Sequence, residues 1–157
     1  MAMGIALVTG ATSGIGEEFC WQLAAAHHDL VLVARREEKL RKLAEDLRQI
    51  AGVKAEVIVA DLGVAGDVDR VAQRLSDEQS PVGLLVNNAG FALGCSFIDN
   101  TIEAEENALD VMVRAPMVLS YAAIDAMRAR GRGAIINVSS VASETGAGTY
   151  SAHKGIQ

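Results

Sequence analysis

The fold is decided by a short segment near the amino terminus, Thr9-Gly10-Ala11-Thr12-Ser13-Gly14-Ile15-Gly16. This segment follows an apolar run at residues 5–8 and precedes a stretch of helical character at residues 15–26. Glycine permits positive φ and a close approach of backbone to ligand, and the free N–H groups of a helix start bind anions. The segment therefore predicts a strand–turn–helix unit that holds a pyrophosphate, although glycine-rich turns also occur for packing reasons alone.

The alternation of strand and helix continues along the whole chain. Further apolar runs, rich in Val, Ile and Leu, are typical of strands covered on both faces. They lie at residues 30–34, 55–60, 84–86 and 134–138. Helical stretches separate them, at residues 37–50, 64–75 and 101–130. This order predicts an α/β fold in which a parallel sheet carries helices on both sides.

A proline lies inside the longest of these helical stretches. Pro116 has no N–H group to donate to the carbonyl of Met112, four residues earlier. We therefore expect a kink at this point and a Met112 carbonyl that is free to accept another hydrogen bond.

Composition excludes several classes of protein. The chain has 157 residues, of which 50% are hydrophobic and 22% charged, as in one ordinary globular domain rather than a disordered or fibrous protein. Its net charge of -6 argues against nucleic acid or an anionic membrane as the main partner. The amino terminus lacks the basic region of a signal peptide, and no apolar run approaches the ~20 residues of a membrane-spanning helix.

Cysteines and histidines give no sign of a metal site or a disulfide framework. Cys20 and Cys95 indicate two reduced thiols in a cytoplasmic protein. Cys95 follows the segment Asn87-Asn88-Ala89-Gly90, and it is either a reactive thiol near a substrate or an ordinary loop residue. The three histidines are predicted to lie on helix surfaces: His27, His28 and His153.

The end of the second predicted strand bears on the choice of cofactor. A carboxylate at this point would bind the 2′-hydroxyl of an adenine ribose, whereas an arginine would pair with a 2′-phosphate. The strand ends Val33-Ala34-Arg35-Arg36 and carries no acid. Arg35 therefore favours NADP(H) over NAD(H), while Arg36 is either a solvated charge at a helix start or a second contact.

A phenol and an ammonium group come together near the carboxyl terminus. Tyr150 and Lys154 are spaced i and i+4, which places them on one face of a helix. A nearby cation lowers the pKa of a tyrosine from its usual value of about 10 and makes it a usable acid/base. Ser139 and Ser140 close the last predicted strand, at the edge where open α/β sheets bind ligands.

Together these segments resemble the short-chain dehydrogenase/reductase family over residues 4–154. The resemblance rests on the turn at residues 9–16, Asp61-Leu62, Asn87-Asn88-Ala89-Gly90, Asn137-Val138-Ser139-Ser140, and Tyr150 with Lys154. It implies a Rossmann-type three-layer αβα sandwich with a doubly wound parallel sheet. It also implies a homo-oligomer that transfers hydride reversibly between NADP(H) and a small-molecule carbonyl/alcohol pair.

The resemblance also implies roles for single residues. Tyr150 would be the general acid/base, Ser140 would orient the carbonyl, and Lys154 would bind the nicotinamide ribose and lower the tyrosine pKa. The implied cofactor contacts, besides Tyr150 and Lys154, are Gly10, Thr12, Ser13, Gly14, Ile15, Gly16, Arg35, Asp61, Leu62, Asn88, Ala89 and Gly90. Without the resemblance, Asp61 equally fits a helix N-cap, and the Asn87-Asn88 pair equally fits a turn.

Two departures from the family pattern affect the proposed chemistry. Met112 stands where the family usually has an asparagine that helps to hold a water of the proton relay. We hypothesise that the backbone carbonyl of Met112 keeps that water, and we interpret Asn107 as a surface residue rather than a substitute. The loop from Ser140 to Tyr150 is shorter than is usual in the family, so Ser139 remains an alternative to Ser140.

The sequence stops three residues after Lys154, whereas members of the family continue with further strands and helices. We therefore expect residues 1–157 to form a single NAD(P)-binding domain that is incomplete at its carboxyl end. A nucleotide-binding or regulatory protein of the same fold, without turnover, is the alternative function. A purely structural domain would leave the glycine triplet and Arg35 unexplained.

Overall fold

The computed structural model describes residues 4–146 and 148–157. Its centre is a five-stranded parallel sheet in the order β3-β2-β1-β4-β5. The strands are β1 (Ile5–Thr9), β2 (Asp29–Ala34), β3 (Ala55–Val59), β4 (Val82–Asn87) and β5 (Ala134–Asn137). From β1 the chain adds β2 and β3 on one side of the sheet, and it then adds β4 and β5 on the other side, so the strand order reverses between β1 and β4. Ligands of open α/β sheets bind at such a reversal, beyond the carboxyl ends of the strands.

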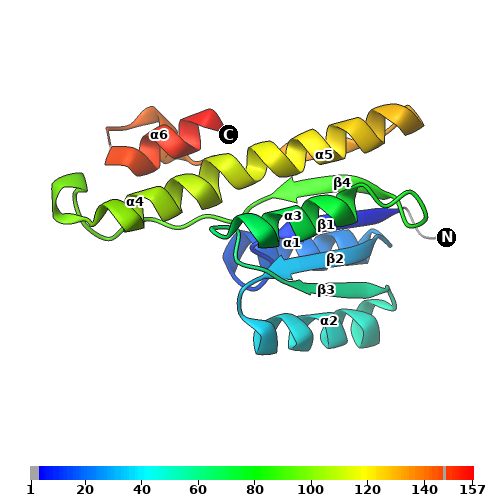
Figure 1. Cartoon of the computed structure of the whole chain (residues 1–157). Helices are drawn as coiled ribbons and strands as arrows, with labels where there is room; N and C mark the ends of the chain where they lie inside the picture. The colour runs from blue at the N-terminus through cyan, green and yellow to red at the C-terminus, as the bar shows by residue number, and fades with distance from the viewer. Residues whose placement is uncertain (1–3, 147) are drawn as a thin grey trace.

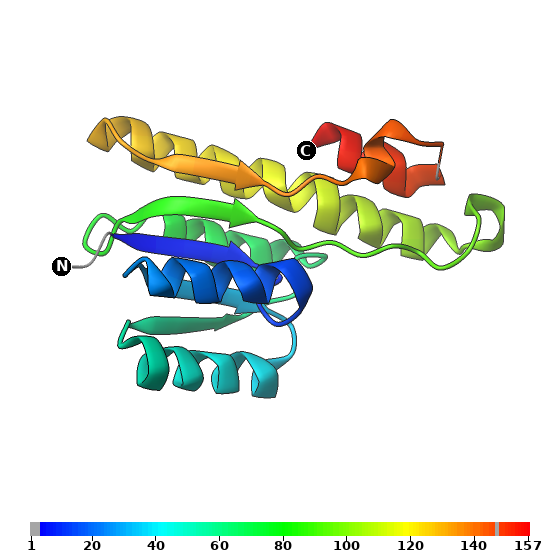
Figure 2. The same cartoon turned by 180° about the vertical axis from the view of Figure 1, so that it is seen from behind.

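Helices cover both faces of this sheet and make three layers (Figure 1). Helices α1 (Gly14–Ala25) and α2 (Glu37–Ala51) pack on one face, where Leu32, Leu40 and Leu47 are fully buried. Helices α3 (Ala65–Leu75) and α5 (Ala115–Arg130) pack on the other face, around Leu7, Val71 and Leu119. Figure 2, from behind, shows α1 in front of the sheet and β5 beside β4. The predicted Rossmann-type sandwich is confirmed.

The strands next to the centre are buried on both faces, as continuous apolar runs require. Residues 6–8 of β1 and 30–33 of β2 are almost inaccessible to solvent. β5 differs because it is an edge strand that pairs only with β4, and Ile136 in it is 38% exposed. The core therefore lies around β1, β2 and β4, which hold the inner edge of the site.

The long helix predicted at residues 101–130 is interrupted. It consists of α4 (Ile102–Leu109), a π-helical turn (Asp110–Arg114) and α5, with Pro116 in the first turn of α5. The carbonyl of Met112 accepts a hydrogen bond from Gln157 Nε2 at 2.8 Å, so it is available to a side chain, as the proline predicts. The Met112 side chain itself is buried in the core.

The last helix, α6 (Gly148–Ile156), lies beyond the carboxyl ends of the strands and beside α4 (Figures 1 and 2). Two short 3-10 segments precede α4 and α6, at Phe97–Asp99 and Val141–Glu144. Within residues 4–146 and 148–157, no helix is both long and apolar enough to span a bilayer.

Candidate functional site

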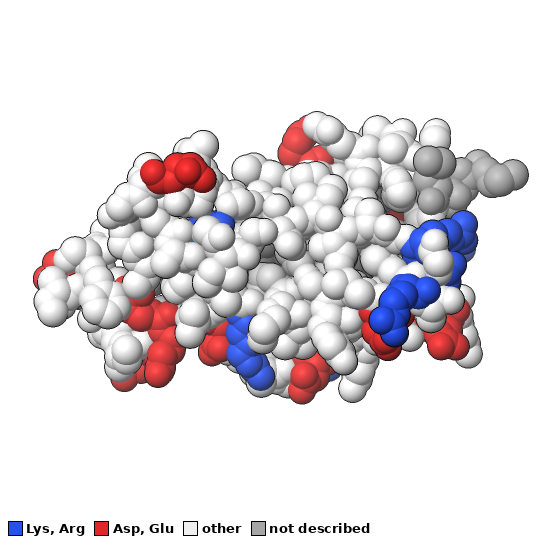
Figure 3. Space-filling model, turned by 90° about the horizontal axis from the view of Figure 1, so that it is seen from above, with Lys and Arg blue, Asp and Glu red and all other residues white. Residues whose placement is uncertain are grey.

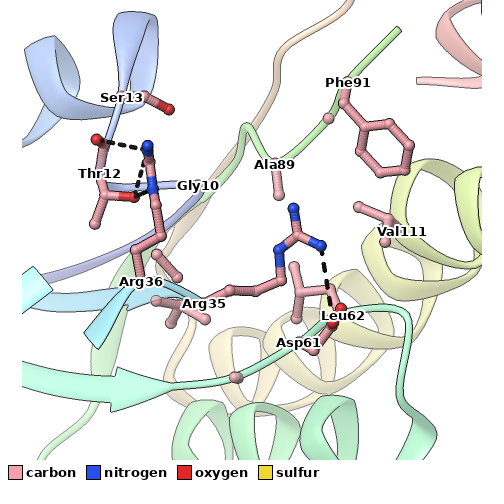
Figure 4. A pocket seen from close by; sticks show the side chains of 14 residues that line it. Gly10, Thr12, Ser13, Arg35, Arg36, Asp61, Leu62, Ala89, Phe91 and Val111 are labelled. Atoms are coloured by element: carbon pink, nitrogen blue, oxygen red, sulfur yellow. Dashed lines mark hydrogen bonds and ion pairs between the residues drawn. The ribbon is translucent and has the colours of Figure 1, made fainter. Parts of the chain in front are cut away.

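A pocket opens where the strand order reverses, at the carboxyl ends of β1, β2, β3 and β4 (Figure 4). The structure brings most of the predicted cofactor contacts to this pocket: Gly10, Thr12, Ser13, Arg35, Asp61, Leu62, Ala89 and Gly90. The other six predicted contacts are not among the lining residues: Gly14, Ile15, Gly16, Asn88, Tyr150 and Lys154. The pocket therefore joins segments that are up to 101 residues apart in the sequence, from Gly10 to Val111.

The glycine turn has the backbone geometry that only glycine adopts easily. Gly10 and Gly14 have φ of +66° and +53°. A Cβ on Gly16 would lie 2.2 Å from the carbonyl oxygen of Gly10, so α1 packs directly on the end of β1. Gly16 therefore shapes the turn from behind, although it does not face the pocket.

The first turn of α1 presents its backbone to this region. Ser13 is the N-cap residue of α1. Among the described residues, its side chain makes no capping hydrogen bond to the N–H groups of the first turn. The first N–H groups of a helix have no partner within the helix, and the helix dipole favours an anion beside them. The turn can therefore accept an anionic group.

The end of β4 is fastened to the end of β1. The hydroxyl of the buried Thr9 accepts from the backbone N–H groups of Asn88 at 3.0 Å and Ala89 at 3.1 Å. The Asn88 amide donates to the carbonyls of Thr9 at 3.1 Å and Gly10 at 3.3 Å. Asn87 donates to Asn137 on β5 at 2.9 Å and to Ser120 on α5 at 3.0 Å. Asn87 and Asn88 thus brace the sheet beneath the pocket and are more than turn residues.

Arg35 extends across the pocket from the end of β2 (Figure 4). Its Nη1 lies 3.8 Å from Asp61 Oδ2, and the two side chains are 62% and 39% exposed. Asp61 Oδ1 also accepts from the N–H of Gly63 at 3.0 Å, and the N-cap of α3 is Val64. Asp61 is therefore a pocket residue rather than a helix cap.

Arg36 turns the other way and fastens the glycine turn. Its Nη2 donates to the carbonyl of Thr12 at 2.9 Å and to the Thr12 hydroxyl at 3.0 Å, and its Nε donates to that hydroxyl at 3.3 Å. Arg36 is thus an exposed residue at the start of α2 that contacts the protein's own turn, and a second contact to the cofactor stays a prediction.

Lys154, on α6, lies close to Gly90, although it is not among the residues that line the pocket. A Cβ on Gly90 would lie 3.1 Å from Lys154 Nζ and 3.5 Å from Met112 Sδ. Nζ donates to the Val138 carbonyl at 2.8 Å and to Gln157 Oε1 at 2.7 Å. Burial of the side chain lowers the pKa of Lys154 below its usual range. The ammonium group therefore lies close to Gly90, which lines the pocket.

The two candidate serines have different partners. Ser139 Oγ donates to the Lys154 carbonyl at 2.6 Å, which ties α6 to the end of β5. Ser140 Oγ accepts a hydrogen bond from the N–H of Ala142 at 3.2 Å. This bond does not use the hydroxyl hydrogen of Ser140. Tyr150 is half-buried on α6 and packs against the apolar layer that contains Met112.

Two surface assignments from the sequence are wrong. His153 is buried at 7% exposure, because α6 turns this face toward α4, and its Nδ1 has no hydrogen-bond partner among the described residues. Asn107 is half-buried, because the chain after β3 passes close to it: a Cβ on Gly63 would lie 2.1 Å from Asn107 Oδ1. His27 is exposed as expected, whereas His28 is half-buried.

Three lining residues lie in none of the motifs that indicated a cofactor site: Ala60, Phe91 and Val111. Val33, Ala34 and Arg36 also line the pocket, and they belong to the segment at the end of β2 that bears on the choice of cofactor. Phe91 directly follows Gly90, so a longer reading of that motif would have included it. Within the part of the chain that the structure describes, no cluster of three His, Cys, Asp or Glu side chains could hold a metal ion.

Comparisons with known proteins agree on one family. Residues 4–156 match the family model described as short chain dehydrogenase. A protein of Staphylococcus epidermidis named as an uncharacterized oxidoreductase is 31% identical over 137 residues, which cover 87% of this chain and 58% of the relative.

Solved structures show the same likeness. A short-chain dehydrogenase from Sphingobium yanoikuyae in complex with NADPH is 36% identical, with a TM-score of 0.94 over 98% of this chain and 61% of the other. The bulky-bulky ketone specific alcohol dehydrogenase from Comamonas testosteroni is 33% identical, with a TM-score of 0.95 over 99% of this chain and 64% of the other. This chain thus spans about three fifths of the length of the proteins that it resembles.

Proposed function

Because the chain belongs to the short-chain dehydrogenase family, we propose that it is the NAD(P)-binding domain of an oxidoreductase. The reaction is hydride transfer between NADP(H) and a small-molecule carbonyl or alcohol. The observation that carries the proposal is the convergence at Gly90. This residue lines the pocket with the glycine turn, and a Cβ on it would lie 3.1 Å from Lys154 Nζ. The pocket that would hold the nucleotide and helix α6, which carries Tyr150 and Lys154, therefore come together at Gly90.

The residues of the pocket fit a dinucleotide. Gly10 and Gly14 give the turn its open backbone, and the start of α1 offers N–H groups to a pyrophosphate. Asp61 and Leu62 would lie beside the adenine, and Ala89 and Gly90 would lie along the cofactor toward Lys154. Thr12, Ser13 and Ile15 belong to the turn, while Gly16 and Asn88 hold its shape.

Arg35 supports NADP(H) rather than NAD(H). Its guanidinium is the cation at the end of β2, it faces the pocket, and its ion pair with Asp61 is long and solvent-exposed. An exposed ion pair contributes little to stability, so Arg35 can exchange Asp61 for a 2′-phosphate at small cost. A phosphate would accept two parallel hydrogen bonds from the guanidinium.

The side chains around Gly90 supply the proton chemistry. When bound, the nicotinamide supplies or accepts the hydride. In the reductive direction Tyr150 donates its hydroxyl proton to the carbonyl oxygen, and the Lys154 ammonium stabilises the phenolate that remains. Ser140 donates a hydrogen bond to the same oxygen, a role open to it because its hydroxyl acts as an acceptor toward Ala142. Ser139 is already committed as a donor to Lys154.

A nucleotide-binding protein without turnover is the second candidate. It is favoured by the Lys154 ammonium, which already has two partners in Val138 and Gln157. Such a protein would bind NADPH through the same pocket, but Tyr150 would have no influence on any rate.

The remaining proposals concern assembly and location. The face seen from above, over α5 and α6, carries few charged side chains (Figure 3). Met117, Tyr121 and Ile124 on α5 are more than half exposed. We propose that apolar side chains of α5 contribute to a homo-oligomer interface. Both cysteines are free thiols, which supports a location in the reducing cytoplasm.

The test is the oxidation of NADPH with a panel of ketones and aldehydes, followed for the protein and for Tyr150→Phe. We expect the variant to bind NADPH normally and to lose at least about a hundredfold in kcat, the usual contribution of a general acid. Equal rates in the two proteins would overturn the assigned chemistry and favour the second candidate.

A further inference from the structure

Glu105 is a buried carboxylate with no place in the chemistry described above. It lies on α4 and is 7% exposed, whereas its neighbour Glu106 on the same helix is exposed. A buried carboxylate requires partners, because removing its charge from water is costly. Its partners therefore indicate what this residue does.

Both carboxylate oxygens of Glu105 have a partner, and the two partners come from different segments. Oε1 accepts from Asn100 Nδ2 at 2.7 Å, at the end of the loop of residues 91–100 that leaves the pocket. Oε2 accepts from Thr149 Oγ1 at 2.6 Å, in the first turn of α6. These hydrogen bonds hold the pKa of Glu105 below its usual range, and the nearby His153 acts in the same direction. The carboxylate is therefore ionised at neutral pH.

Helix α6 needs anchors of this kind. Its position relative to the sheet is set by tertiary contacts, because most of the stability of a helix in a protein comes from such packing. Its carboxyl-terminal half is tied down through Lys154, which bonds to Val138 and accepts from Ser139. Tyr150, however, lies in the first turn, at the other end of the helix.

The Glu105–Thr149 bond fixes that first turn to the body of the molecule. A longer contact of 3.4 Å joins Ser151 to Thr145, but Thr145 belongs to the segment that leads into the helix. A negative charge beside a helix amino terminus is also favoured by the helix dipole. Thr149 directly precedes Tyr150, so its anchor determines where the phenol stands.

We propose that Glu105 is a positioning residue for Tyr150, because it anchors the first turn of α6 and the loop of residues 91–100 to α4. The positioning role rests on the proposed function of Tyr150, whereas the anchoring does not. No contact between Glu105 and a substrate is required.

The anchor is tested by hydrogen exchange of the backbone amides in residues 148–156, measured in the protein without ligand. Glu105→Ala and Thr149→Val should each speed this exchange by about tenfold or more, the effect of losing a charge-assisted hydrogen bond on local opening. The double variant should exchange no faster than Glu105→Ala alone, because that substitution already removes the bond to Thr149 together with the bond to Asn100. Thr149→Ser, which keeps the hydroxyl, and the exposed Glu106→Ala are the matched controls and should exchange like the parent.

Positioning is tested in the same proteins by steady-state kinetics in which the NADPH concentration is varied up to saturation. Thr149→Val should lower kcat at least about tenfold and leave the KM for NADPH unchanged, and Thr149→Ser should restore kcat. Unchanged exchange in both Thr149→Val and Glu105→Ala overturns the anchor, whatever the activity. Faster exchange with an unchanged kcat, in a protein that Tyr150→Phe inactivates, overturns the positioning role. If exchange is faster but Tyr150→Phe does not change kcat, the anchor stands and the proposed function of Tyr150 is wrong.

Discussion

Arg35 Nη1 lies 3.8 Å from Asp61 Oδ2, and this long ion pair joins the ends of two neighbouring strands across the nucleotide pocket. Both partners are largely open to solvent, so neither is held in the pair by burial. Under the proposed function, the pair places an exposed cation where the 2′-phosphate of NADP(H) would lie.

Arg35→Ala should therefore change cofactor choice rather than the fold. We expect the affinity for NADPH to fall about 10- to 100-fold, the range for losing charged hydrogen bonds, while the affinity for NADH changes little. Fluorescence titrations with the two cofactors measure this. Arg36→Ala is the matched control: it releases Thr12 and should weaken both cofactors alike. Equal losses for both cofactors in Arg35→Ala would refute the assignment to NADP(H).

Gly16→Ala tests the close packing beneath the turn. The new Cβ would lie 2.2 Å from the Gly10 carbonyl oxygen and 2.3 Å from Asn88 Nδ2, so backbone has to move. We expect a loss of about 1–3 kcal/mol in the free energy of unfolding and a weaker cofactor affinity. Gly66→Ala in α3 meets nothing within 4 Å and should be neutral or stabilising by up to about 1 kcal/mol. Urea unfolding of both variants measures the difference, and identical midpoints would contradict the packing argument.

The two cysteines should differ sharply in reactivity. Cys20 is buried against the sheet, and desolvation raises its pKa to about 12. Cys95 is exposed in its loop. Because the thiolate is the reactive form, a thiol reagent at pH 8 should modify one cysteine in the folded protein and both in urea. Rapid modification of Cys20 in the native state would show that α1 does not pack as described.

The fold could be predicted from the sequence because its strands coincide with short apolar runs that are rich in Val, Ile and Leu. β1 and β2 contain uninterrupted apolar runs at residues 5–8 and 30–34, and each strand is followed by a turn and a helix. Strand ends shifted by only one or two residues at β2 and β4. Pro116 predicted a kink and a free Met112 carbonyl, but not that the interruption is a π-helical turn.

Contacts within the candidate site could be predicted only where the interacting residues lie close together in one sequence motif. Tyr150 and Lys154 share a helix, and the glycine turn is continuous in sequence. Contacts between distant segments left no such signal: Arg36 with Thr12, and Glu105 with Thr149. His153 was misplaced for the same reason, since a face of α6 becomes buried only through its contact with α4.

Met112→Asn tests whether the missing family asparagine matters. The hydrogen-bonding group in the structure is the backbone carbonyl of Met112, which the substitution retains. We expect kcat to stay within about threefold, and the free energy of unfolding to fall by about 1–3 kcal/mol because an amide enters the core. Turnover per folded molecule is the measurement, and a hundredfold gain would show that the proton relay is broken at Met112.

The most direct test of the central claim is a fluorescence titration of the unmodified protein with NADPH and, in parallel, NADH. The account predicts saturable changes in NADPH emission and a dissociation constant about tenfold or more below that for NADH, because only NADPH carries the phosphate that Arg35 can bind. Absence of any spectral change with NADPH, or equal affinities for the two cofactors, would contradict it.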